Sequence, residues 1–152
     1  MLALIRPDSW NLPLFVHVLG AMVLVGCLVC AAGALVIGWR RDSGALTWLA
    51  FRTLLLGALP GYVVMRIGAQ WVYSREGFHG KLDASWIVIG FLTADLGALL
   101  LLVTLVLTGL AARKLRAAGS GTSALSRAGG AIALVLVVAY VVAIWAMTAK
   151  PA

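Results

Sequence analysis

Three ionisable side chains lie inside stretches of the chain that are otherwise apolar. They are His17, Arg66 and Asp95, each in a different apolar run. An imidazole can ligate a metal or carry protons, and a guanidinium binds carboxylates and phosphates in a fixed geometry. Because charged and ionisable groups are expensive in an apolar surrounding, we interpret these three residues as candidate functional residues.

Polar residues recur along the second apolar run at intervals that place them on one face of a helix. Arg52, Arg66 and Tyr73 are separated by multiples of seven, and Tyr62 and Gln70 lie four residues to either side of Arg66. Arginines facing lipid are costly, so this face is predicted to line the interior of a bundle or an aqueous cavity. Arg52 lies close enough to the end of its run to extend its guanidinium to the membrane surface.

Asp95 is predicted to pair with Arg66. With a rise of about 1.5 Å per residue, His17, Arg66 and Asp95 all fall roughly 8 to 14 Å below the same membrane surface. Two interpretations stay open at this point. The pair either fixes the register of two helices, or belongs with Tyr62 and Gln70 to a site that relays protons or holds a ligand.

The helix face that carries His17 is lined by small residues. Along it lie Gly20, Ala21, Cys27, Ala31 and Gly38. A second helix or a flat cofactor can approach such a groove closely, and a histidine there can also simply hydrogen-bond across a bundle. Cys27 and Cys30 are predicted to lie at mid-membrane, where thiols act as small packing groups without a chemical role.

The segment LFVHVLGAMVLVG, Leu14 to Gly26, resembles the first helix of a group of bacterial membrane proteins that includes the copper-resistance D family and the membrane-embedded protoporphyrinogen oxidases. An aliphatic-His-x-x-Gly segment with a downstream glycine recurs in that group and is matched by His17, Gly20 and Gly26. Some members bind b-type haem through the histidine of this helix. The resemblance therefore implies His17 as an axial metal ligand of haem b, Gly20 beside the macrocycle and Arg66 as a partner of a propionate.

The chain also departs from that group. Leu24, Val25 and Cys27 stand where many members carry a tryptophan and a second glycine. The apolar runs contain no second histidine to complete a bis-histidine haem site. The match covers roughly one helix in four and rests on a short motif.

The elements that position these residues are predicted to be four transmembrane helices. Of the 152 residues, 63% are hydrophobic and 11% are charged, and the mean hydropathy is +1.07. A helix needs roughly 20 mostly apolar residues to cross a bilayer. The segments that meet this need are residues 12–38, 45–73, 86–112 and 128–148. We therefore predict an all-α, polytopic four-helix bundle forming one integral membrane domain over residues 1–152, with a kink near Pro60-Gly61.

The basic residues indicate an orientation in the membrane. The formal net charge is +7, and half of the twelve Lys and Arg residues fall in the loops 40–44 and 113–127. The positive-inside rule places these loops in the cytoplasm and both termini outside, in a bacterial plasma membrane. Because the charge is explained in this way, no nucleic-acid partner is expected.

Three functions remain compatible with the sequence, and none of them requires an enzyme. The first is a haem-binding or redox-accessory membrane protein that uses His17, Arg66 and Asp95. The second is a component of proton-coupled transport, and the third is a structural partner subunit or assembly factor without a cofactor. Lipid is the expected surrounding, with a homodimer or a larger membrane complex as the assembly.

Overall fold

The computed structural model describes residues 11–75, 85–118 and 123–149, and nearly all of them are helical. The helices are α1 (Asn11–Arg41), α2 (Gly44–Thr53), a π-helical turn η2 (Leu54–Ala58), α3 (Leu59–Arg75), α4 (Ser85–Ala118) and α5 (Ala124–Ala149). Because α2, η2 and α3 run on without a break, the described residues form four helices long and apolar enough to cross a membrane. The predicted all-α four-helix membrane bundle is confirmed.

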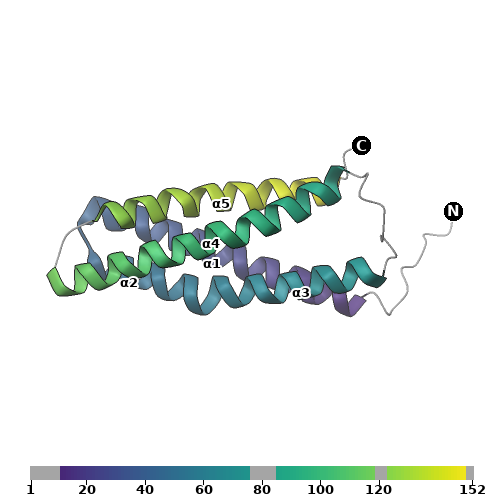
Figure 1. Cartoon of the computed structure of the whole chain (residues 1–152), viewed down its shortest axis with the longest axis horizontal. Helices are drawn as coiled ribbons and strands as arrows, with labels where there is room; N and C mark the ends of the chain where they lie inside the picture. The colour runs from purple at the N-terminus through teal and green to yellow at the C-terminus, as the bar shows by residue number, and fades with distance from the viewer. Residues whose placement is uncertain (1–10, 76–84, 119–122, 150–152) are drawn as a thin grey trace.

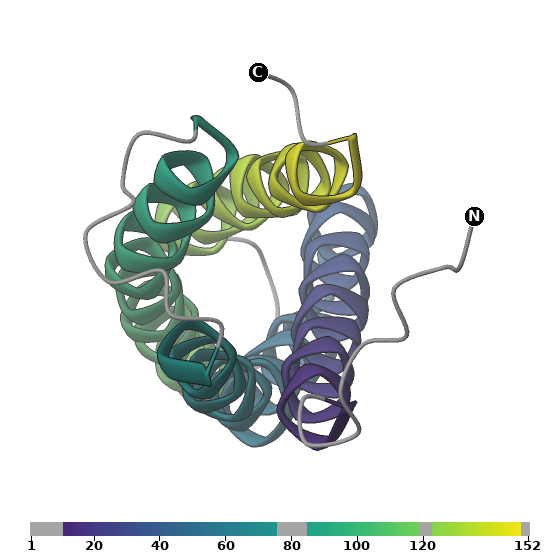
Figure 2. The ribbon, with the colours of Figure 1, turned by 90° about the vertical axis from the view of Figure 1, so that its right-hand side faces the viewer.

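The helices lie side by side along the long axis of the molecule (Figure 1). Helix α1 packs extensively against α3 and also against α5, α5 packs against α4, and α2 contacts both α1 and α4. Helices α3 and α4 approach each other far less closely, and Figure 2 shows the ring of helices from one end. The start of α1 and the end of α5 lie at the same end of the bundle. We call the opposite end, with the α1–α2 turn and the facing ends of α4 and α5, the turn end.

The outward faces of the bundle are apolar. In the most apolar part of each membrane-crossing helix, at most 33% of the residues are buried within the chain. Leucines, valines and isoleucines cover the outside of every helix. The buried positions hold mainly alanine and leucine, with Leu24, Leu28 and Leu35 of α1 fully buried. Small residues at helix contacts and large apolar residues facing outward are typical of a protein solvated by lipid.

The two basic loops are shorter than the sequence predicts. Arg40 and Arg41 still belong to α1, and the turn consists of Asp42 and Ser43. Asp42 adopts a left-handed φ of 47°, and the Ser43 amide donates to the Gly38 carbonyl at 3.1 Å. This is the hydrogen bond of a Schellman cap, in which Asp replaces the usual glycine because its short polar side chain tolerates the left-handed region. The predicted connection 113–127 is likewise helical at both ends, since α4 runs to Ala118 and α5 begins at Ala124.

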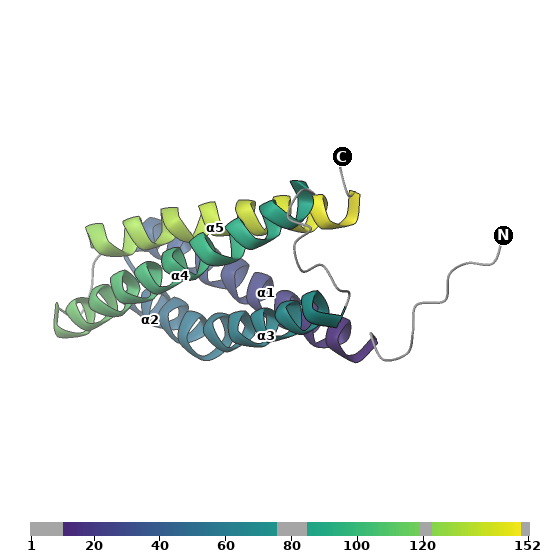
Figure 3. The ribbon, with the colours of Figure 1, turned by 45° about the vertical axis from the view of Figure 1, so that its right-hand side comes forward.

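The second crossing is irregular one turn before the predicted kink at Pro60-Gly61. The Leu59 amide donates to the Leu54 carbonyl, five residues earlier, so the turn is π-helical. Pro60 has no amide hydrogen and its ring crowds the carbonyl four residues before it, which a wider turn accommodates. The direction of the crossing changes between α2 and α3 (Figure 3). The wide turn also breaks the simple helical spacing between Arg52 and Arg66.

Glycines bring α1 and α3 into backbone contact. A Cβ atom on Gly20 would collide with the Met65 backbone, and one on Gly68 would collide with the His17 backbone. A Cβ on Gly61 would lie 2.9 Å from the Leu24 amide nitrogen. The three contacts follow one another along the antiparallel pair, so the two helices approach closely over several turns.

Replacing Gly20 with alanine is expected to lower the free energy of unfolding by roughly 1 to 3 kcal/mol, because the added methyl overpacks the helix contact. Gly26→Ala is the matched control on the same helix, since nothing lies within 4 Å of a Cβ there. Alanine favours a helix over glycine by about 1 kcal/mol, so the control should be neutral or slightly stabilising. Unfolding in detergent followed by circular dichroism measures both; equal effects of the two variants would contradict the close contact.

Candidate functional site

His17 lies in the contact between α1 and α3. Its Nδ1 lies 3.0 Å from the Met65 carbonyl oxygen, and its backbone is covered by Gly68. Since a carbonyl only accepts, Nδ1 carries the hydrogen and donates it, which leaves the electron pair of the neutral ring on Nε2. The side chain is partly buried. The histidine therefore ties two membrane helices together through a single hydrogen bond.

The glycine in the groove beside His17 packs against α3. The space next to Gly20 is filled by the Met65 backbone, so α3 occupies the place that the resemblance to haem-binding proteins gives to a cofactor. The engaged Nδ1 does match the way ligating histidines are oriented. Met65 itself is buried at 5% exposure. The haem assignment of His17 and Gly20 stays a prediction from sequence, and the packing around Gly20 does not favour it.

Arg66 and Asp95 form an ion pair between α3 and α4. The Arg66 Nη2 lies 2.9 Å from the Asp95 Oδ1, and the guanidinium carbon stands 5.2 Å from the centre of the Phe91 ring. One turn away, the Tyr62 hydroxyl donates to the Ala94 carbonyl at 3.2 Å. Long side chains thus bridge two helices whose backbones stay apart. The pairing of Arg66 with Asp95 that the sequence predicts is present.

The three ionisable groups share a level in the bundle but not a pocket. Met65, the residue that accepts from His17, directly precedes Arg66 in the sequence. Successive residues on a helix are turned by about 100°, so Met65 faces α1 while Arg66 faces α4. Helix α3 therefore stands between the imidazole and the ion pair. The expected common centre of His17, Arg66 and Asp95 is replaced by two separate polar contacts on two faces of α3.

The ion pair lies on the outer side of the contact between α3 and α4. The Asp95 side chain is 62% exposed and that of Arg66 is 31% exposed. Exposed residues surround them on both helices, and we call this surface the α3–α4 flank: Val63, Arg66 and Gln70 of α3 with Leu92, Asp95 and Leu99 of α4. The predicted polar stripe thus points outward rather than into the bundle. Arg52 is exposed as well, beyond the π-helical turn.

Other candidates from the sequence have ordinary surroundings. The Cys27 Sγ packs against Gly57 in the π-helical turn, and Cys30 is exposed. Within the described residues, no group of three histidine, cysteine or acidic side chains is arranged to hold a metal ion.

Two features were missed by reasoning from the sequence. Tyr140 of α5 is buried at 5% exposure, and its hydroxyl has no hydrogen-bond partner among the described residues. It fits against Gly97 of α4, where a Cβ would lie 2.5 Å from the hydroxyl oxygen. At the turn end, the Arg116 guanidinium stacks on Trp48 with 4.3 Å to the ring centre. Tyr140 could have been identified from the sequence, because its hydroxyl is a polar group inside an otherwise apolar run. No spacing in the sequence connects Arg116 with Trp48.

Comparison with protein-family models, with curated proteins and with solved structures finds no match to the chain.

We expect the protein purified from haem-replete cells to show no Soret band that depends on His17, because α3 fills the groove beside that residue. His17→Ala should lower the free energy of unfolding by about 0.6 kcal/mol, the typical value of one hydrogen bond between membrane helices. Absorption spectra and detergent unfolding of the two proteins test both statements. A Soret band in the wild type that disappears in His17→Ala would restore the haem assignment.

Proposed function

We propose that this protein is a non-catalytic integral membrane subunit that assembles through its α3–α4 flank. The observation that carries the proposal is the exposure of Asp95, whose side chain is 62% exposed in the isolated chain. Asp95 lies seven residues from Val88, the start of its candidate span, or about 10 Å along the helix axis. A carboxylate at this depth is costly against acyl chains unless a further polar group covers it.

The hydrogen-bonding groups of the flank indicate which kind of partner binds to it. Asp95 accepts from Arg66 through one oxygen, and an ionised carboxylate has capacity for further donors. Gln70, one turn from Arg66, is exposed and carries amide donors. The flank therefore presents donors and an acceptor side by side and is complementary to itself. A second copy of this chain, related by a two-fold axis, brings Arg66 or Gln70 against Asp95.

Proton-coupled transport receives less support from the same geometry. The stripe of polar residues does not run along the interior of the bundle, because Arg52 and Gln70 are exposed and Arg66 faces the outer side of α4. Asp95 pairs with Arg66 on the outer side of the contact between α3 and α4, not on a path through the interior of the bundle.

The assembly is tested with the double variant Arg66→Met, Asp95→Leu. Removing both charges leaves no uncompensated ion, so the variant should fold, while losing the polar groups that join two copies. In a background with Cys27→Ala and Cys30→Ala, Leu99→Cys should cross-link between copies in membranes when the charges are present and not in the double variant.

Val138→Cys on α5 is the matched control for this cross-linking. Val138 and Leu99 have similar exposures, 62% and 59%, but Val138 lies outside the flank and should not cross-link. A wild-type chain that stays monomeric in bilayers overturns the proposal, and so does a double variant that cross-links as well as the parent. A chain that forms no homodimer but binds another membrane protein through the flank would also overturn the proposed second copy, and that protein would then be the partner.

We further propose that the turn end lies in the cytoplasm of a bacterium and that the protein resides in the plasma membrane. Arg40 and Arg41 of α1 and Arg113, Lys114 and Arg116 of α4 gather at this end, and clusters of cations mark the cytoplasmic side. The antiparallel order then places the start of α1 and the end of α5 on the outer side.

Orientation is measured with single cysteines in the background that lacks Cys27 and Cys30. Thr148→Cys near the end of α5 should react with a membrane-impermeant thiol reagent added to intact cells, because that residue is exposed at the outer end. Ala117→Cys, exposed at the turn end, should react only after the cells are opened. The reverse pattern of labelling would invert the proposed orientation.

A further inference from the structure

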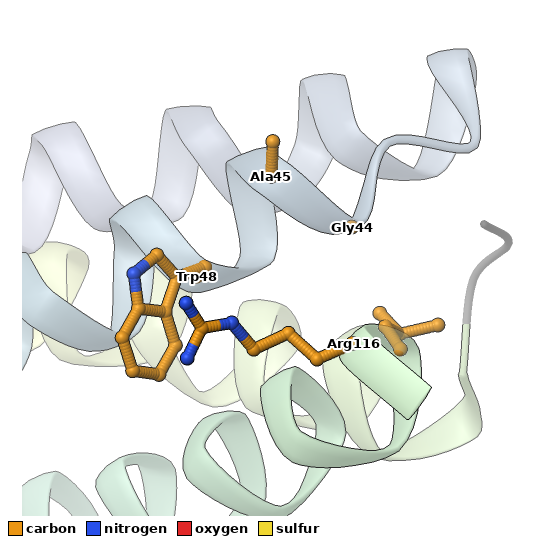
Figure 4. A pocket seen from close by; sticks show the side chains of 5 residues that line it. Gly44, Ala45, Trp48 and Arg116 are labelled. Atoms are coloured by element: carbon orange, nitrogen blue, oxygen red, sulfur yellow. The ribbon is translucent and has the colours of Figure 1, made fainter. Parts of the chain in front are cut away.

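At the turn end, α2 and α4 border an open cavity that the ion-pair flank does not involve. Its volume is about 400 Å³, and its lining consists of Gly44, Ala45, Trp48, Leu115 and Arg116. Figure 4 shows the Arg116 side chain extending from α4 to the indole of Trp48 on α2. The cavity thus combines one cation, one aromatic face and apolar walls.

The Arg116 guanidinium has donors to offer. Its flat face stacks on Trp48, which fixes the orientation of the group and leaves the N–H edge free for hydrogen bonding. Among the described residues, the guanidinium stacks on the Trp48 indole and makes no hydrogen bond or ion pair. An oriented guanidinium with unused donors in a cavity is suited to bind an oxyanion in a bidentate manner.

The surroundings favour an anion over a cation. Cations crowd this end of the bundle, namely Arg40, Arg41, Arg113, Lys114 and Arg127 in addition to Arg116, and Asp42 is the acidic residue among the described residues there. Gly44 and Ala45 are the first residues of α2, and the side chain of Ser43 makes no capping hydrogen bond. The amides in the first turn of a helix have no partner within that helix, and Gly44 and Ala45, which carry two of them, line the cavity.

The position of the cavity points to a lipid as the source of the anion. Trp48 is a residue type that prefers the membrane–water interface. Leu115 forms an apolar part of the lining, and the Phe51 ring, one turn along α2, lies 5.5 Å from the Trp48 ring, centre to centre. Apolar surface thus continues from the cavity along α2 toward the part of the helix that crosses the membrane, where an acyl chain can lie.

We propose that the cavity between α2 and α4 binds the phosphate of an anionic phospholipid, with Arg116 as the bidentate donor and Trp48 as the platform that orients it. Basic pockets between membrane helices recognise lipid headgroups in this way. The proposal is independent of the assembly through the α3–α4 flank, which lies elsewhere on the bundle.

The test compares the binding of phosphatidylglycerol and phosphatidylcholine to the full chain by native mass spectrometry from mixed-lipid nanodiscs. Arg116→Gln should reduce the preference for phosphatidylglycerol about fivefold relative to Arg113→Gln. Arg113 is the matched control, because it is exposed on the same helix and loses the same charge but does not line the cavity. Trp48→Leu, which keeps every charge, should also reduce the preference.

Three outcomes would overturn the proposal. Equal losses in Arg116→Gln and Arg113→Gln would show a general electrostatic attraction and no specific site. An unchanged preference in both Arg116→Gln and Trp48→Leu would remove the cavity from lipid binding. Displacement of the bound phosphatidylglycerol by millimolar inorganic phosphate alone would make the site one for free phosphate.

Discussion

The close contact between α1 and α3 is the interaction on which the rest of this bundle depends. In a bilayer the hydrophobic effect does not drive helices together, so packing at short range and interhelical hydrogen bonds must do so. Gly20, Gly61 and Gly68 remove the side chains that would separate the two backbones. The hydrogen bond from His17 to the Met65 carbonyl forms only because the helices are this close.

This contact also fixes how α3 presents its other faces. With Met65 and Gly68 held against α1, Arg66 is turned toward α4 and meets Asp95. The two polar contacts therefore share a level of the membrane while serving different helix pairs. The ion pair lies on the outer side of the bundle, where it is costly against lipid unless a second polypeptide covers it. The function that we propose follows from that placement.

The two ends of the membrane-crossing part differ in their electrostatics. The turn end collects the cations of α1, α4 and α5, and one of them, Arg116, is oriented by stacking on Trp48. The other end of the bundle contains the ion pair and the histidine in its half of the membrane. A subunit that associates through the α3–α4 flank and binds anionic lipid at the turn end would use separate surfaces for the two tasks.

The sequence by itself determined the class of the protein and the positions of its four crossings, because length and hydropathy decide whether a helix can span a bilayer. It also indicated the pairing of Arg66 with Asp95, since an acid and a base at equal depth on adjacent crossings have few other ways to be neutralised. These inferences rest on local composition and on the cost of charge in lipid, and both can be read from one chain.

Only the tertiary structure decided what each face meets. The spacing of His17 and Gly20 is equally compatible with a cofactor and with a helix, and in the structure the backbone of α3 lies against Gly20. The π-helical turn of Leu54–Ala58 removed the regular spacing that had placed Arg52 and Arg66 on one inward face. The stacking of Arg116 on Trp48 joins residues far apart in the sequence. Helical spacing defines angles around one axis, whereas the rotation of each helix in the bundle depends on contacts with all its neighbours.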